Sequence, residues 1–213
     1  MALVPYDTNR HILHELHDPR RVFSIGGHDI EIEQTFSSNG VAGCVWQSAV
    51  VLAQYFAANT DLVKDKNVLE LGAGTGLLGI ACHHFGGNVI STDHEDAISS
   101  TEMNFKLNEI PLKHCRSLNW GSDIGTFLEE SASSPPDVVL GADIVYIKDT
   151  FDLLMKTLID ISSLKQCPIY LACKIRYEKD ENFIKKAENF FKVEDLDHEI
   201  DLNIKIYRLD YLK

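Results

Sequence analysis

The chain has 213 residues, and 45% of them are hydrophobic, enough to fill the core of one sizeable domain. We expect one domain, with an N-terminal extension over residues 1–45 and a core over 46–213, acting as a monomer. The 32 acidic residues outnumber the 20 basic ones, so the formal net charge is −12 and the surface repels phosphate backbones. We therefore expect no nucleic acid as a partner. A membrane is not expected either, because no apolar run approaches the roughly 20 residues that span a bilayer.

Cysteine and histidine usage gives no sign of a metal site. The five cysteines are scattered and lack the C-x-x-C spacing of zinc or redox sites, which predicts buried thiols in a reducing, cytoplasmic compartment. His11, His14 and His17 could share one face of a helix and hold a metal, but no carboxylate or cysteine ligands accompany them. We predict no bound metal.

The first regular element is a β-hairpin. Residues 22–25 and 28–33 flank Gly26 and Gly27, a pair typical of tight turns, and apolar residues alternate with charged ones in the second segment. We expect this hairpin to lie outside the main sheet.

An apolar run over residues 49–58 then predicts a helix, which ends at a polar segment beginning with Asn59. Trp46 stands at the entrance to this helix. A large aromatic side chain here can simply pack in the core, or it can form a wall of a ligand pocket.

The most informative stretch is Val68-Leu69-Glu70-Leu71-Gly72-Ala73-Gly74-Thr75-Gly76, in which an apolar strand runs into a glycine-rich turn. A helix over residues 77–85 follows. The glycines remove the Cβ atoms that would keep a ligand away from the backbone, and the N–H groups at the start of the helix face outward. A ligand is therefore expected over this turn.

A second apolar run, over residues 88–92, ends in Asp93. A carboxylate there can accept hydrogen bonds from both ribose hydroxyls of a nucleoside. Residues 74–79 read G-x-G-x-x-G, so a dinucleotide, S-adenosylmethionine and a purely structural glycine turn are all considered. The dinucleotide motif needs its first glycine close after the strand. Here the match begins only at Gly74, and Gly72 occupies the place close after the strand, which argues against a dinucleotide. The turn E-L-G-x-G-T-G favours S-adenosylmethionine, because it resembles the first motif of seven-strand methyltransferases.

Later segments continue the alternation of strands and helices. Trp120 follows a short predicted strand over residues 115–118, at the end of the sheet where ligands of open α/β folds bind, so its ring could stack on an adenine. The last two strands have no helix between them and should form an antiparallel pair at one edge of a mostly parallel sheet. The remaining predicted elements are a helix over 95–108, a loop over 131–136, a strand over 137–142, a helix over 149–162, a strand over 168–174, a helix over 178–190, and strands over 191–195 and 202–211.

Polar groups appear abruptly after the buried strand over residues 137–142, in Asp143-Ile144-Val145-Tyr146. Methyl transfer to a lysine needs a neutral amine, and holding it neutral at pH 7 costs about 4 to 5 kcal/mol. Asp143 could orient the amine and Tyr146 could offer an aromatic wall with a hydroxyl group. Alternatively, Asp143 caps a helix and Tyr146 packs in the core. Methyltransferases of nucleobase amines typically carry D/N-P-P-Y/F here, and this chain has no proline in the segment.

Taken together, these motifs resemble the seven-strand protein-lysine methyltransferases that carry a D/E-x-x-Y/F motif. Residues 1–6, 40–46 and 171–178 narrow the resemblance to members that trimethylate one lysine of seventy-kilodalton heat-shock (Hsp70) chaperones in cytosol and nucleus. The resemblance implies an α/β fold with one Rossmann-like domain, S-adenosylmethionine as cofactor, and Asp143 and Tyr146 as catalytic residues in a lysine channel. The cofactor contacts that it implies are Trp46, Glu70, Gly72, Ala73, Gly74, Asp93, Trp120 and Ala142.

Three alternatives remain open at this point. The chain could methylate a lysine of another protein, or bind chaperones without turnover. It could also be a dinucleotide-dependent oxidoreductase, since Tyr170 and Lys174 have the spacing Tyr-x-x-x-Lys. That pair lies in a predicted strand, where a spacing of four does not bring two side chains together as it does on a helix.

Overall fold

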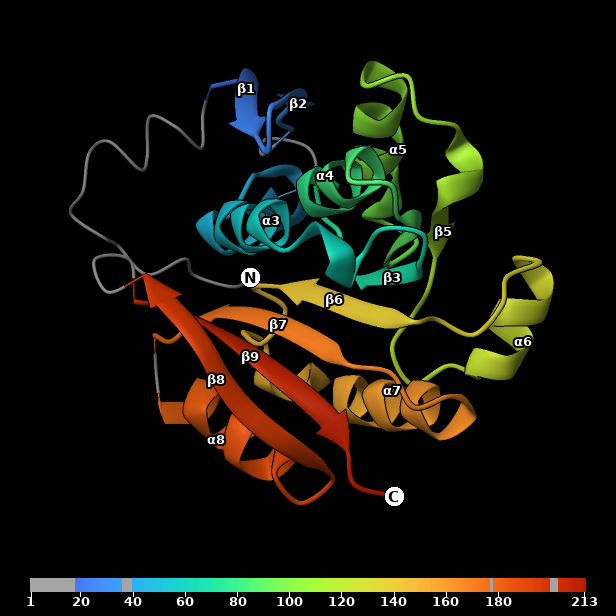
Figure 1. The fold of residues 1–213 in the computed structure, drawn as a ribbon, viewed down its shortest axis with the longest axis vertical. Coiled ribbons are helices and arrows are strands. Elements are labelled where there is room, and N and C mark those ends of the chain that lie inside the picture. Colours follow the sequence, from blue (N-terminus) through green and yellow to red (C-terminus); the bar gives the residue numbers. More distant parts are fainter. Residues whose placement is uncertain (1–17, 36–39, 177, 200–202) are drawn as a thin grey trace.

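The computed structural model describes residues 18–35, 40–176, 178–199 and 203–213. Its centre is a seven-stranded sheet covered by helices on both faces, and a two-stranded hairpin lies outside the sheet (Figure 1). His11, His14 and His17 lie outside the described residues. The hairpin is formed by β1 (Arg20–Ile25) and β2 (His28–Glu33). In spatial order, the sheet strands are β5 (Cys115–Ser117), β4 (Asn88–Asp93), β3 (Asn67–Leu71), β6 (Val138–Ala142), β7 (Ile169–Lys174), β9 (Ile204–Tyr211) and β8 (Phe191–Glu199).

The helices divide between the two faces of the sheet (Figure 1). One face is covered by α3 (Gln47–Ala58), α4 (Leu77–His84) and α5 (Ile98–Leu107), and the other by α6 (Ile124–Glu130), α7 (Phe151–Leu164) and α8 (Glu178–Ala187). Because both faces are buried, the central strands β3, β6 and β7 are mostly apolar, and Glu70 on β3 is a buried polar exception. In β3, Val68 packs toward α3 and α4, whereas Leu69 and Leu71 pack toward the opposite layer.

The strand pattern matches the sequence predictions closely. The hairpin and the antiparallel pair of closing strands are confirmed, and β9 pairs antiparallel with both β7 and β8. The structure adds α6, which the sequence did not predict. This helix is short and contains Gly125. Asp123 caps its N-terminus, since the Asp123 side chain accepts a hydrogen bond from the backbone N–H of Thr126 at 2.6 Å.

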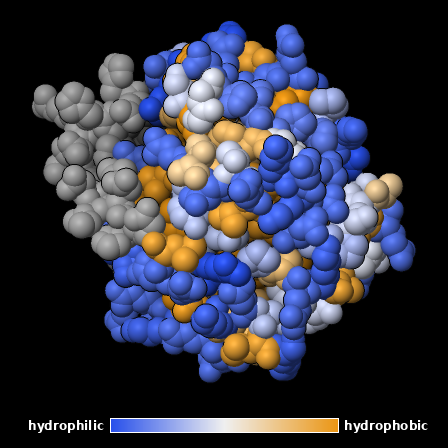
Figure 2. Space-filling view, viewed as in Figure 1, coloured by the Kyte–Doolittle hydropathy of each residue, from blue (hydrophilic) through white to orange (hydrophobic). Residues whose placement is uncertain are grey.

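No helix within the described residues is long and apolar enough to cross a membrane. The face shown in Figure 2 is mainly hydrophilic, with apolar residues exposed in small separate groups. Among the residues that the structure describes, the large apolar side chains that are exposed are Val22, Ile147, Leu153, Leu164 and Leu212.

The hairpin is tied to the rest of the molecule by Asn104 of α5, which is completely buried. Its amide oxygen accepts a hydrogen bond from the backbone N–H of Glu33 at 2.8 Å. Its amide nitrogen donates to the backbone oxygens of Glu33 at 3.1 Å and Thr75 at 3.0 Å. One side chain therefore links β2, α5 and the glycine-rich turn.

Replacing Asn104 by alanine should destabilise the fold, because it removes the partner of one buried backbone oxygen, that of Thr75, and of two part-buried backbone groups of Glu33. We expect the free energy of unfolding to fall by about 2 to 4 kcal/mol, measured by urea denaturation. Asn189→Ala is the matched control, since Asn189 donates one exposed hydrogen bond to Lys186, and it should change stability by no more than about 0.5 kcal/mol. Equal effects of the two substitutions would contradict the role assigned to Asn104.

Candidate active site

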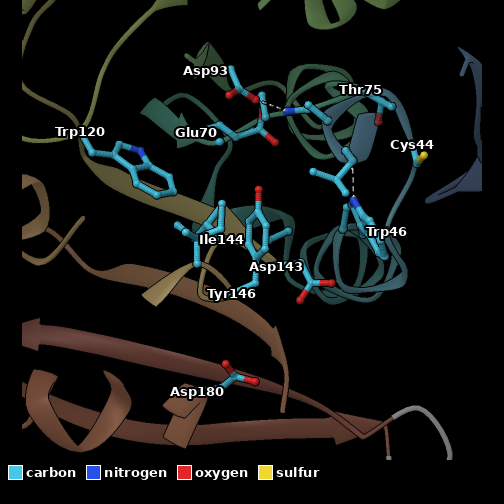
Figure 3. A pocket seen from close by; sticks show the side chains of 18 of the residues that line it. Cys44, Trp46, Glu70, Thr75, Asp93, Trp120, Asp143, Ile144, Tyr146 and Asp180 are labelled. Carbon is cyan, nitrogen blue, oxygen red and sulfur yellow. Dashed lines mark hydrogen bonds between the residues drawn. The ribbon is translucent and has the colours of Figure 1, made fainter. Parts of the chain in front are cut away.

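A cavity of about 410 Å³ opens at the carboxyl ends of the central strands (Figure 3). β3 pairs in parallel with both β4 and β6, so the chain connections leave this point of the sheet in opposite directions. Ligands of open α/β folds bind in the crevice at such a point. Every site residue expected from the sequence lines the cavity: Trp46, Glu70, Gly72, Ala73, Gly74, Asp93, Trp120, Ala142, Asp143 and Tyr146.

The glycine-rich turn requires its glycines. Gly72, Gly74 and Gly76 have φ values of +64°, +56° and +81°, a left-handed conformation that residues with a Cβ atom adopt at a cost. A Cβ atom on Gly72 would also lie 2.6 Å from Cγ2 of Ile144 and 3.4 Å from the ring of Trp120. The turn can therefore bring its backbone close to a ligand only with glycine at these positions.

Asp93 links the end of β4 to this turn. Its carboxylate accepts hydrogen bonds from the backbone N–H groups of Gly74 at 2.6 Å and His94 at 2.7 Å. Burial raises the pKa of Asp93, and these hydrogen bonds oppose the rise. Each carboxylate oxygen has a second lone pair, so Asp93 can still accept hydrogen bonds from the two hydroxyls of a ribose.

Glu70 supports the turn from below. Glu70 is 2% exposed, and its carboxyl group accepts hydrogen bonds from the Ser91 hydroxyl at 2.5 Å and from the backbone N–H of Gly79. A Cβ atom on Gly79 would collide with both Ser91 and Glu70, which explains the last glycine of the G-x-G-x-x-G pattern. Burial raises the pKa of Glu70 to about 8. Glu70 thus joins β3, β4 and α4 beneath the cavity.

Aromatic side chains form the walls. In the view of Figure 3, the phenol of Tyr146 points into the space between Trp120 and Trp46. Trp46 immediately precedes α3, and its indole N–H donates to the backbone oxygen of Val41 at 2.8 Å. Burial, and then the charges of Asp93 and Asp143, raise the pKa of Tyr146. Tyr146 therefore keeps its hydroxyl proton at neutral pH.

Asp143 is held in an unusual conformation at the end of β6. Its φ is +55°, its backbone N–H donates to Ala172 on β7 at 2.8 Å, and its side chain is only 6% exposed. Both carboxylate oxygens accept hydrogen bonds from Arg176, at 2.9 and 2.8 Å. The alternative that Asp143 caps a helix is therefore wrong, because its carboxylate forms a two-pronged ion pair instead.

The loop after β7 and the first turn of α8 supply site residues to which the sequence analysis gave no role. The Arg176 guanidinium lies 5.7 Å from the centre of the Trp46 ring, and the Arg176 backbone N–H donates to Asp180 at 3.0 Å. Lys179 donates from its ammonium group to the backbone oxygen of Tyr146 at 2.5 Å. We call the region formed by Asp143, Tyr146, Arg176, Lys179 and Asp180 the acceptor end of the cavity.

Strand order was the one feature of the sequence prediction that could have placed these residues at the cavity. Because β6 and β7 are parallel neighbours, the residues that follow them must meet at one edge of the sheet. Spacing in the sequence gave no such signal, since 33 positions separate Asp143 from Arg176. The Tyr170 and Lys174 pair does not contribute to the cavity. Tyr170 is 1% exposed and packs edge-on against Phe56, with ring centroids 5.2 Å apart.

Fold and cavity together define a seven-strand methyltransferase. The chain belongs to the lysine methyltransferase family, whose family model matches residues 25–190. Protein N-lysine methyltransferase METTL21A of Danio rerio is 37% identical over 214 aligned residues, covering 98% of this chain and 95% of the relative. EEF1A lysine methyltransferase 3 of Mus musculus is 38% identical over 191 residues, covering 87% and 80%. The expected enzyme class is confirmed: a protein-lysine methyltransferase that uses S-adenosylmethionine.

Solved structures confirm the fold at much lower identity. A T. thermophilus 16S rRNA methyltransferase in complex with S-adenosylmethionine and guanosine has a TM-score of 0.61 at 16% identity, covering 90% of this chain and 50% of that one. Magnesium protoporphyrin IX methyltransferase from Synechocystis, also with bound S-adenosylmethionine, has a TM-score of 0.51 at 15% identity, covering 78% of each chain. One fold thus serves acceptors as different as RNA and a porphyrin.

Gly72→Ala should weaken binding of S-adenosylmethionine at least tenfold, because the new Cβ atom intrudes between Ile144 and Trp120. Gly27→Ala is the matched control. Gly27 also has a positive φ, +83°, but a Cβ atom there meets nothing within 4 Å. Both variants should lose about 1 to 2 kcal/mol of stability through backbone strain. Only Gly72→Ala should change the dissociation constant measured by titration calorimetry, and unchanged affinity would contradict this account of the turn.

Glu70 should make stability depend on pH. The folded chain keeps the Glu70 proton up to about pH 8, whereas the unfolded chain loses it near the ordinary pKa of 4.5. The folded state binds more protons in this window, so raising the pH lowers the free energy of unfolding by about 1.4 kcal/mol per pH unit. Between pH 5 and 8, the free energy of unfolding of the native chain should fall by about 3 to 5 kcal/mol relative to that of Glu70→Gln, measured by urea denaturation at each pH. Parallel curves for the two proteins would contradict the prediction.

Proposed function

We propose that this protein-lysine methyltransferase trimethylates one lysine of an Hsp70 chaperone in the cytosol and nucleus, acting as a monomer. One observation carries the assignment of the site. A single cavity joins the glycine-rich turn and Asp93 to the Asp143–Tyr146 segment, so donor and acceptor can meet. The chaperone is supported by sequence resemblance over nearly the whole chain, and by the 98% coverage in the match to METTL21A of Danio rerio.

S-adenosylmethionine fits the residues at the glycine-rich end of the cavity. Gly72 and Gly74 leave open the space that Cβ atoms would fill, Asp93 offers carboxylate oxygens for a ribose, and Trp120 offers a ring for an adenine. We assign cofactor binding to these residues together with Trp46, Ala73 and Ala142, and a supporting role to Glu70. When bound, the cofactor supplies an electrophilic methyl group on its sulfonium.

The acceptor end must present a lysine side chain without its proton. The aromatic walls of Trp46 and Tyr146 remove water from the amine, which favours its uncharged form. Asp143 and the Tyr146 hydroxyl can hold the nitrogen by hydrogen bonds so that its lone pair has a fixed direction. We assign no net proton acceptance to Tyr146, because its raised pKa keeps the hydroxyl protonated. The proton leaves to water at the open side of the cavity.

A second acceptor has a specific observation in its favour. The Mus musculus EEF1A lysine methyltransferase 3 is as similar to this chain as METTL21A is, at 38% against 37% identity, although over less of the chain. The cavity alone does not distinguish the two acceptors, because each would present a lysine side chain. Elongation factor 1A therefore belongs beside Hsp70 in the first assay.

The test is transfer of a labelled methyl group from S-adenosylmethionine to a purified Hsp70 chaperone, elongation factor 1A and an unrelated lysine-rich protein. We expect labelling of one lysine of the chaperone, up to the trimethylated form by mass spectrometry. Asp93→Asn should raise the dissociation constant of the cofactor about tenfold to hundredfold, which corresponds to about 1.4 to 2.7 kcal/mol. Asp143→Ala should lower kcat at least tenfold while cofactor binding persists.

Asp160→Asn is the matched control, because Asp160 forms an exposed ion pair with Lys156 on α7, and it should behave as the native chain. Labelling of elongation factor 1A alone would replace the proposed acceptor. Cofactor binding without labelling of any protein would favour a binding module without turnover.

A further inference from the structure

Arg176 lines the acceptor end of the cavity, where the proposed function places the acceptor lysine. Its guanidinium pairs with both oxygens of Asp143 and lies beside the Trp46 ring. The side chains of Arg176 and Asp143 are 22% and 6% exposed, so water screens the pair weakly. Burial acts to lower the pKa of Arg176, but its hydrogen bonds with Asp143 and the charge of that group raise it overall. Arg176 is therefore permanently charged.

The acceptor end has no excess of negative charge, although the whole chain carries −12. Asp143 and Asp180 supply two carboxylates there, and Arg176 and Lys179 supply two cations, with Lys148 as a further cation in the cavity lining. The other ionisable groups that line the cavity or lie against the pair are Cys44 before α3, Glu70 on β3, Asp93 on β4, Tyr146 after β6 and Cys173 on β7.

We propose that Arg176 neutralises Asp143 so that the acceptor end admits the uncharged amine of a lysine and gives no advantage to the ammonium form. The proposal concerns the acceptor half of the proposed function and makes Arg176 a positioning residue. It acts through Asp143, whose oxygens it holds in place, and through its positive charge near the incoming nitrogen.

The physical reason is the difference between a paired and an unpaired carboxylate. A buried carboxylate without a partner attracts an ammonium group and stabilises its proton, because the opposite charge lies close in a weakly screened site. Methyl transfer needs the nitrogen lone pair, so this attraction would oppose the reaction. A carboxylate already paired with arginine still accepts a hydrogen bond through its remaining lone pairs, but it provides no net charge.

A purely structural role is the competing explanation. The pair joins the segments after β6 and β7, and Lys179 adds a second link to the same loop through the Tyr146 backbone oxygen. Loss of Arg176 would then lower stability without changing which form of an amine the cavity accepts. The two explanations differ in the charge preference of the site, which can be measured without any protein acceptor.

The experiment compares n-butylammonium, which has the length and charge of a lysine side chain, with uncharged n-butanol at pH 7.5. Thermal stabilisation is followed against the concentration of each probe at constant ionic strength. The native chain should show no preference for the ammonium. Arg176→Met should respond to n-butylammonium at concentrations at least tenfold lower than to n-butanol, and adding Asp143→Asn should abolish that preference. Arg176→Lys, which keeps the charge, should behave as the native chain.

Arg208→Met is the matched control, since it removes an arginine paired with Asp210 at 3.0 Å, outside the residues that line the cavity. It should show the native response. A tenfold preference of the native chain for n-butylammonium would overturn the proposal. So would an Arg176→Met variant that folds and binds S-adenosylmethionine but gains no preference, because the pair would then be structural only.

A second test of the role of Arg176 measures turnover of the protein acceptor that the labelling assay identifies. The pH dependence of kcat reports ionisation in the enzyme–substrate complex. Its rising limb should move up by about one pH unit in Arg176→Met, a tenfold loss of kcat at neutral pH, and stay near native in Arg176→Lys. An unmoved limb in Arg176→Met would contradict the proposal. If no chaperone is labelled, the acceptor proposed above fails, whereas the amine measurement still decides the role of Arg176.

Discussion

The hydrogen bond between the Gly74 backbone N–H and the Asp93 carboxylate is the interaction on which the site depends most directly. It joins the loop that follows β3 to the end of β4, and a neighbouring bond from the Ala73 N–H to the Thr92 oxygen, 2.9 Å long, reinforces it. Thr101 of α5 donates to the Gly74 oxygen at 2.8 Å, so the turn is held on two sides. Catalytic geometry in this fold is thus set by backbone groups that a ligand does not have to organise.

Much of this architecture could be predicted because its signals are local. A strand, a glycine-rich turn and a helix are contiguous in sequence, and the alternation of strands and helices determined the sheet. The helix α6 was missed because Gly125 and Thr126 are weak helix formers and its seven residues are too few for a clear period. Arg176 received no role because its partner is distant in sequence and the pairing depends on strand order, which no spacing within a segment reveals.

The two halves of the cavity use charge in opposite ways. At the cofactor end, Asp93 is held by backbone N–H groups and keeps lone pairs for hydroxyl groups of a ligand. At the acceptor end, Asp143 is matched by a guanidinium, and the loop that carries it is fixed by Lys179. This division suits methyl transfer from S-adenosylmethionine to lysine. The positively charged cofactor must be bound, whereas the lysine ammonium group must first lose its proton. The same fold can then change acceptors by changing the surface around the cavity.

The linkage made by Asn104 has a practical consequence for defining a minimal catalytic fragment. The family model begins at Ile25, the last residue of β1, so a fragment cut there would keep β2 without its pairing strand. Glu33 at the end of β2 and Thr75 in the glycine-rich turn hydrogen-bond to the same buried amide. Loosening the hairpin would therefore be transmitted directly to the turn. A minimal fragment should therefore include β1, which begins before the start of the family model.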